Sequence, residues 1–149
     1  MNSHAQNRLN RTIFIFSILG IVVAVYVLQS FLRQAPIVCI NSGCELVRKH
    51  PASYLFGIPV PAFGLIGYSI LALLSFLRTL DFPSQLKMRF LLTMLGVSLF
   101  GVLFVAYFTF VEVFVIRGIC TWCALSAVNM IIIFSITFRL MRKERNHSS

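Results

Sequence analysis

The chain has 149 residues, of which 58% are hydrophobic and only 11% are charged, and its mean hydropathy is +0.89. Soluble domains are about 45–50% apolar, so this composition excludes an ordinary soluble protein. The net charge of +9 could suit a nucleic acid, but short basic runs beside apolar segments are what membrane topology alone requires, and we expect no nucleic-acid partner.

Four uncharged stretches are long enough to cross a bilayer, which takes about 20 residues of helix. Together they account for more than half of the chain and leave no room for a separate soluble domain. We therefore expect one integral membrane domain over residues 1–149, an all-α membrane protein built as a four-transmembrane-helix bundle. The expected spans are Thr12–Leu32, Pro59–Leu77, Phe90–Val111 and Ile119–Phe138.

The first stretch follows Arg8 and Arg11, as the apolar region of a secretory signal would. It is 21 residues long, whereas the apolar region of a signal peptide is usually about 7–15 residues long. No small-residue cleavage site precedes Arg33. We expect an uncleaved first span.

The connection between the first and second spans, residues 33–58, contains Cys39 and Cys44. The segment that follows them, Glu45–His50 (ELVRKH), is predicted to form a short surface helix. Near the end of the third span, Glu112 is expected at the membrane interface.

The fourth span opens with a second cysteine pair, Cys120 and Cys123. Gly118 is expected to cap this helix, so that Cys120 lies in its first turn, where free backbone N–H groups and the helix dipole favour a thiolate. Thiolates are the attacking species in disulfide exchange. Cys123 lies one turn deeper on the same face, where a lipid-soluble oxidant could reach it. This placement predicts electron transfer from aqueous thiols to a molecule dissolved in the membrane.

Basic residues near span ends stay predominantly on the cytoplasmic side, and their distribution predicts the orientation. Nine of the 13 Lys and Arg residues lie at the N-terminus, between the second and third spans and in the tail, and four lie on the other side. We therefore expect both termini in the cytoplasm and all four cysteines on the outer, disulfide-permitting side. The nine are Arg8, Arg11, Arg78, Lys87, Arg89, Arg139, Arg142, Lys143 and Arg145.

Four cysteines allow three pairings, and the sequence does not choose among them. Two purely structural disulfides are one alternative, although a bond between Cys120 and Cys123 closes a very small loop and stabilises little. A four-cysteine zinc site has admissible spacings, but the second pair sits at the membrane mouth with no knuckle glycine. Ala124 stands where a c-type haem attachment motif requires histidine. We expect no metal.

The order of the cysteines and the motifs between them resemble those of a known protein family. The stretch Ser53–Tyr68 (SYLFGIPVPAFGLIGY) follows the loop cysteine pair and precedes the C-x-x-C of the last span. This cysteine order, with a serine after the loop pair, a Gly-Ile-Pro segment and Phe-Gly-x-x-x-Tyr, resembles the vitamin K epoxide reductase family in its bacterial form. The resemblance covers roughly Thr12 to Phe138. It implies a redox-active outer loop between helices 1 and 2, and a quinone-linked thiol–disulfide oxidoreductase.

The resemblance also implies roles for individual residues. Cys120 and Cys123 match the active-site pair, with Cys123 facing the quinone, which would be ubiquinone or menaquinone. Cys39 and Cys44 match the loop shuttle pair, with Cys44 as the partner of Cys120 in an inter-pair disulfide. Ser53 matches the family's loop serine or threonine near the active site.

Further residues are expected around the quinone. Phe63, Gly64 and Tyr68 match the second-span segment that lines the quinone pocket. Aromatic side chains can pack on a quinone ring or belong to the interfacial belt or the core, and the candidates are Phe56, Phe63 and Trp122. Asn129 could bond a pocket carbonyl or a neighbouring helix.

Two positions depart from the vertebrate enzymes. Val60 stands where those enzymes have a pocket asparagine, and Ala127 stands where they have a tyrosine. Hydrogen bonding to an epoxide or a quinone carbonyl is therefore in doubt at both places, and epoxide reduction is not expected.

The family resemblance also implies a partner. Many bacterial members carry a fused thioredoxin-like domain that is not found in these 149 residues. We therefore expect a separate thioredoxin-like thiol oxidase on the outer side of a bacterial inner membrane, with membrane lipid around the bundle. The predicted net chemistry is disulfide generation linked to quinone.

Three rival functions stay open. An unrelated family of four-span quinone-linked disulfide oxidases runs the same reaction, but usually with its C-x-x-C ahead of the other pair. A quinol-driven reductase of the same fold would run the reaction in reverse. A non-enzymatic membrane subunit with structural disulfides would bind no quinone.

Overall fold

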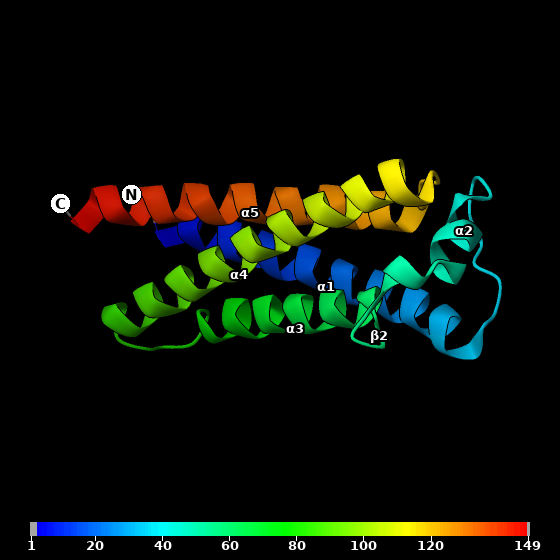
Figure 1. Cartoon of the computed structure of the whole chain (residues 1–149). Helices are drawn as coiled ribbons and strands as arrows, with labels where there is room; N and C mark the ends of the chain where they lie inside the picture. The colour runs from blue at the N-terminus through cyan, green and yellow to red at the C-terminus, as the bar shows by residue number, and fades with distance from the viewer. Residues whose placement is uncertain (1–2, 149) are drawn as a thin grey trace.

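The fold is described from a computed structural model, for residues 3–148. Four helices are long and apolar enough to cross a membrane: α1 (Ser3–Arg33), α3 (Val60–Leu77), α4 (Ser84–Val111) continued by the π-helical turn η2 (Glu112–Ile116), and α5 (Thr121–Ser148). They lie alongside one another as an elongated bundle (Figure 1). The predicted all-α four-helix membrane bundle is confirmed.

Both chain termini and the turn from α3 to α4 lie at one end of the bundle (Figure 1). We call this the terminal end. The opposite end, which we call the cysteine end, holds the connection from α1 to α3 and the start of α5. Helices α1 and α5 extend beyond the uncharged stretches of the sequence, to Ser3 and Ser148, because backbone hydrogen bonding continues into the charged flanks.

The connection from α1 to α3 folds as a cap over the cysteine end. It contains α2 (Gly43–Lys49), the 3-10 turn η1 (Pro51–Ser53) and a two-stranded hairpin of β1 (Tyr54–Leu55) and β2 (Ile58–Pro59). The short helix predicted over Glu45–His50 is thus present, although it begins at Gly43 and includes Cys44. The hairpin turns at two residues with left-handed backbone, Phe56 (φ 53°) and Gly57 (φ 78°), as tight hairpins require.

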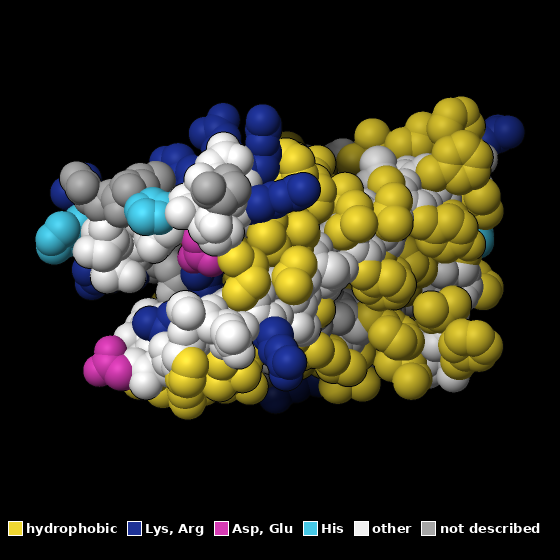
Figure 2. Space-filling view, turned by 90° about the vertical axis from the view of Figure 1, so that its left-hand side faces the viewer, with side chains coloured by type: hydrophobic (Ala, Val, Ile, Leu, Met, Phe, Trp, Pro, Cys, Tyr) yellow, Lys and Arg dark blue, Asp and Glu magenta, His cyan; other side chains and the backbone are white. Residues whose placement is uncertain are grey.

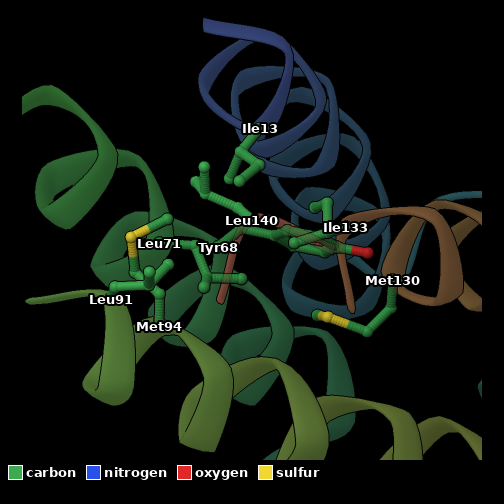
Figure 3. Packing of buried hydrophobic residues seen from close by; sticks show 8 residues of the cluster. All are labelled: Ile13, Tyr68, Leu71, Leu91, Met94, Met130, Ile133 and Leu140. Atoms are coloured by element: carbon green, nitrogen blue, oxygen red, sulfur yellow. The ribbon is translucent and has the colours of Figure 1, made fainter. Parts of the chain in front are cut away.

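Toward the terminal end, the four helices meet in a closed core. Figure 3 shows the eight side chains of this core, which we call the closed core: Ile13, Tyr68, Leu71, Leu91, Met94, Met130, Ile133 and Leu140. Between helices in a membrane, close packing and interhelical hydrogen bonds replace the hydrophobic effect as the main attraction.

Two polar contacts secure the terminal end. Asn10 and Ser75 bond reciprocally between α1 and α3: the Asn10 Nδ2 donates to the Ser75 carbonyl, and the Ser75 hydroxyl donates to the Asn10 carbonyl, each over 2.8 Å. Arg78 forms a buried ion pair with Glu144 of α5. Figure 2, which views the molecule from this end, shows Lys and Arg side chains gathered over part of the face and hydrophobic side chains over the rest.

Candidate active site

The loop cysteines Cys39 and Cys44 form a disulfide, with 6.3 Å between their Cα atoms. Cys44 is the second residue of α2 and is only 1% exposed. Cys39 lies in the extended segment before α2 and is half-buried. The bond therefore has one sulfur nearer the surface and one turned into the protein.

Close backbone contact holds α2 against the start of α5. A side chain at Gly43 would collide with the backbone of Ile119, and one at Gly118 would press on Leu46. Only glycine fits such an approach at residue 43. The helix that contains Cys44 is thereby set directly beside the segment that contains Cys120.

A small polar network fixes α2 to the end of α1. The Glu45 carboxylate accepts the backbone N–H of Ile37 over 3.1 Å and pairs with Arg48 over 2.6 Å, and Arg48 donates to Gln34 over 3.0 Å. The hydrogen bond from Arg48 holds the pKa of the Glu45 carboxyl below its usual value, and the same bond raises the pKa of Arg48. The network stabilises the cap with both groups charged.

Ser53, the predicted loop serine, is 3% exposed and donates its hydroxyl to the carbonyl of Val47 near the end of α2. The bond turns the chain from α2 toward the hairpin. Ser53 also faces the cavity described below. It thus joins the cap to the bundle.

The second cysteine pair lies at the start of α5, and both members are free thiols. Cys120 immediately precedes the helix, and its carbonyl accepts the N–H of Ala124 over 3.0 Å. The expectation that it lies in the first turn, with Gly118 as the cap, is therefore wrong: the helix begins two residues later, at Thr121, and Cys120 occupies the capping position. Cys120 is 2% exposed, and Cys123 is half-buried.

The two pairs meet through Cys44 and Cys120. Their sulfur atoms are 3.2 Å apart, although the residues are 76 positions apart in the sequence. Both sulfurs lie in one buried cluster with Val27, Phe31 and Val47. Disulfide exchange proceeds by attack of a thiolate on a disulfide sulfur, and this distance brings the two sulfurs together for such an attack.

Trp122 fixes the segment that precedes the loop disulfide. Its ring N–H donates to the carbonyl of Val38 over 2.7 Å, and its ring packs on Tyr26 of α1 with 5.0 Å between centroids. The Tyr26 hydroxyl in turn accepts the N–H of Val38 over 3.3 Å. Cys39 directly follows Val38 in the chain, so this contact fixes the backbone that leads into the disulfide.

A cavity of about 420 Å³ opens below the cysteines, between α1, α3, α4 and the first turns of α5. Its wall is mainly apolar, and Cys123 forms part of it. Such a volume is within the range of about 300–1,000 Å³ that is usual for small-molecule sites. Other predicted residues on the wall are Ser53, Phe63, Gly64, Tyr68 and Trp122, and Val60 also lines it.

Three predicted quinone-binding residues do not line this cavity. Phe56 is at the tip of the hairpin and 93% exposed. Asn129 instead donates its Nδ2 to the carbonyl of Phe16 over 3.0 Å, which links α5 to α1. Ala127 is half-buried on α5 and outside the cavity wall.

Among the cavity residues that were not predicted as part of the site, two have polar side chains close to Tyr68 or the cysteines. Ser126 shares a hydrogen-bond contact with the Tyr68 hydroxyl, which donates to the Ser126 carbonyl and meets its Oγ, each over 3.0 Å. Its position three residues after Cys123, on the same helix face, was the available signal. Glu112 was expected at the interface, but it is buried, 4% exposed, and its Oε2 accepts the backbone N–H of Cys120 over 3.4 Å. The sequence did not predict this burial, which arises because η2 turns the side chain inward.

Among residues 3–148, no group of three or more His, Cys, Asp or Glu side chains is arranged to hold a metal ion. The fold and the site together define a multi-pass membrane protein that brings a loop disulfide against a dithiol beside an apolar cavity. In a comparison with models of known protein families, the model of the vitamin K epoxide reductase family matches residues 11–138 of the chain. The chain belongs to this family, whose chemistry is quinone-linked disulfide exchange. A comparison with curated proteins finds no match.

Proposed function

We propose that the chain is a quinone-dependent thiol–disulfide oxidoreductase that generates disulfides in a separate thioredoxin-like partner on the outer side of the membrane. The observation that supports this most strongly is the 3.2 Å contact between the sulfurs of Cys44 and Cys120. It provides a direct route between a loop disulfide near the surface and a dithiol beside a cavity within the bundle. Two merely structural disulfides would have no need of such a contact.

The relay begins at the loop. A thiolate of the reduced partner attacks Cys39, the less buried sulfur, and releases Cys44 as a thiolate. The second thiol of the partner then resolves the mixed bond, so that the partner leaves with a disulfide and the loop is left as a dithiol. The partner loses two electrons and two protons in this exchange.

The next exchange passes through Cys44. Its thiolate attacks Cys120 of an oxidised Cys120–Cys123 pair and releases Cys123 as a thiolate at the cavity wall. Cys39 then attacks Cys44, which restores the loop disulfide and releases Cys120. The state that results, with a loop disulfide and two free thiols, is the state of the described structure.

A quinone bound in the cavity supplies the oxidising power, because it takes up two electrons and two protons to become quinol. The protein's own part is to hold Cys123 at the wall, to exclude water with apolar side chains, and to re-form the Cys120–Cys123 bond. The Ser126 hydroxyl lies on the same wall, beside the Tyr68 hydroxyl that donates to the Ser126 carbonyl. A hydroxyl donor suits a carbonyl oxygen of a quinone ring.

The cavity also suits a ligand with a lipid tail. Ile66 of α3 and Phe100 of α4 both line it, yet they are 58% and 68% exposed on the outside of the bundle. The cavity wall is therefore continuous with the outer surface of these two helices. In a bilayer this surface faces lipid, and a quinone could enter sideways.

The proposal places both termini in the cytoplasm and the cysteine end at the outer face of a bacterial inner membrane. Nine basic residues of 13 belong to the terminal end, as expected when basic flanks stay inside. The direction of electron flow is part of the proposal, since every thiol exchange in the relay is reversible. A quinol-driven reductase would use the same contacts in reverse.

The test is complementation of a bacterial strain that lacks its own disulfide-generating membrane enzyme. The parent should restore disulfides in an outer-side reporter, and Cys120→Ser and Cys123→Ser should not. Ser135→Ala, on an exposed position of α5, serves as the matched control and should behave as the parent. Purified protein should also reduce added quinone at the expense of a dithiol partner. Restoration by both cysteine variants would refute the proposal.

A further inference from the structure

The Glu112 carboxyl occupies an unusual position between the dithiol and the cavity. It is 4% exposed, accepts the backbone N–H of Cys120 over 3.4 Å, and lines the same cavity wall as Cys123. One group is thus next to both members of the reactive pair. It also reaches the space where an electron acceptor would lie.

No cation neutralises Glu112 in the described part of the chain. The ion pairs among residues 3–148 join Glu45 to Arg48 and Lys49, and Arg78 to Glu144. A buried carboxylate without a cation is costly, and ionisable groups at membrane depth usually serve a function. The backbone N–H of Cys120 could be capped by a neutral serine or asparagine just as well. Capping alone does not explain an acid at this position.

The π-helical turn directs the side chain inward. Glu112 begins η2, where the carbonyl of Glu112 accepts the N–H of Gly118 over 3.1 Å and Arg117 takes a left-handed conformation with φ of 57°. Single π-helical turns are rare within helices and are frequent at functional sites. Here the turn ends α4 and leads the chain directly to Cys120.

We propose that Glu112 is a proton-transfer residue of the dithiol, and this inference rests on the quinone-linked function proposed above. As the Cys120–Cys123 bond forms, the Cys123 thiol proton moves to the Glu112 carboxylate, which becomes a carboxylic acid. The acid then releases that proton into the cavity, to a carbonyl oxygen of the quinone under reduction. The second proton comes from Cys120, so that two protons and two electrons leave the dithiol and one quinone becomes one quinol.

Other titratable groups near Glu112 are already accounted for. Cys123 of α5 lines the same cavity as Glu112, and Cys120, the residue before α5, donates its backbone N–H to it. From α2, which packs on η2, Cys44 is in a disulfide, and Glu45 is paired with Arg48. On its own segment, Arg117 is exposed. The thiols are therefore the groups with which Glu112 can exchange a proton.

The test compares Glu112→Gln with Glu112→Asp. Glutamine keeps the size of the side chain and an oxygen for the Cys120 N–H, but it cannot exchange a proton. Aspartate keeps the acid on a shorter arm. General acid–base groups typically contribute about 10²–10⁴-fold to rate, so quinone reduction should fall roughly 10²-fold in Glu112→Gln and recover in part in Glu112→Asp.

A second readout uses purified protein without quinone. The pH dependence of Cys123 alkylation should shift to lower pH in Glu112→Gln, because loss of the nearby negative charge makes the Cys123 thiolate easier to form. A slower enzyme with a more readily ionised thiol is the signature of lost proton transfer. Damage to the fold would instead raise alkylation at every pH.

The outcomes separate the two proposals. If the parent does not reduce quinone, the proposed function itself fails. If the parent reduces quinone and Glu112→Gln does so at the same rate with the same pH profile, only the role of Glu112 is refuted. An unshifted alkylation profile together with no recovery in Glu112→Asp would identify Glu112 as a helix cap, and would overturn the inference as well.

Discussion

At the terminal end the helices meet in the closed core, whereas at the cysteine end they part around a space of about 420 Å³, and Tyr68 and Met130 lie where the two regions join. The closed core is made of large apolar side chains and is flanked by reciprocal bonds and an ion pair. The cysteine end instead has a cap held by a small polar network, with the reactive sulfurs beneath it. The difference indicates that one half of the bundle maintains the fold and leaves the other half free to hold a ligand.

The largest effect on stability should come from the closed core. Leu71 is fully buried there and does not line the cavity. Leu71→Ala should lower the free energy of unfolding by about 2–5 kcal/mol, because the surrounding helices can fill the space only in part. Unfolding in detergent measures this. Quinone reduction below the unfolding transition should stay close to that of the parent, and a loss of turnover in the folded variant would break the division between the two halves.

A smaller effect on stability, but a large one on function, is expected at Gly43. A methyl group there would collide with the Ile119 backbone, so α2 must move away from the start of α5. Overpacking of this kind costs about 1–3 kcal/mol. Because Cys44 is next to Gly43, the exchange between Cys44 and Cys120 should slow markedly.

The matched control for Gly43→Ala is Gly64→Ala, where the added methyl would meet no atom within 4 Å. Rapid-quench measurement of the exchange, with alkylation of the free thiols, follows both variants. Equal exchange rates in Gly43→Ala and the parent would mean that the close packing of α2 on residue 119 is not what positions Cys44.

The smallest effect concerns the polar network of the cap. The pKa of Glu45 is lowered by its bond from Arg48. The Glu45–Arg48 pair therefore stabilises the cap above the unfolded-state pKa of glutamate, about 4.3. This stabilisation is lost as the pH falls through the lower folded-state pKa of Glu45. The pair is partly exposed, so this contribution should stay within about 1 kcal/mol.

The fluorescence of Trp122, the single tryptophan, reports on the cap because its ring N–H donates to Val38. Acid should change this signal in the parent in the range below about pH 4. Glu45→Gln should have a weaker cap at neutral pH and no such acid step. An identical acid transition in Glu45→Gln would assign the step to another group.

Much of the fold could be predicted from the sequence, because span length and the absence of charge are direct consequences of the bilayer. The short helix after Cys44 was predictable for similar reasons, since its composition is locally helical. Which side chains of α5 face the cavity was harder to predict. Asn129 lies six residues after Cys123, about 240° around the helix at 3.6 residues per turn, and so it contacts α1 rather than the cavity.

The remaining errors have a common origin in tertiary packing. Nothing in the local sequence signals that Glu112 starts a π-helical turn and points inward. Likewise, Phe56 adopts a left-handed conformation that aromatic residues rarely take, which puts its ring outside the site. Both depend on how the cap and helices meet, and sequence patterns do not report this.

The central claim is that electrons pass between Cys44 and Cys120, and trapping of that bond tests it most directly. In the double variant Cys39→Ser, Cys123→Ser, the remaining Cys44 and Cys120 have no competing partner. Their sulfurs are 3.2 Å apart in the parent. The account predicts that a Cys44–Cys120 disulfide accumulates, detected as a cross-linked peptide by mass spectrometry and as altered mobility on non-reducing gels. The reciprocal variant Cys44→Ser, Cys123→Ser should give no Cys39–Cys120 link. A link only in the reciprocal variant, or in neither, would contradict the account.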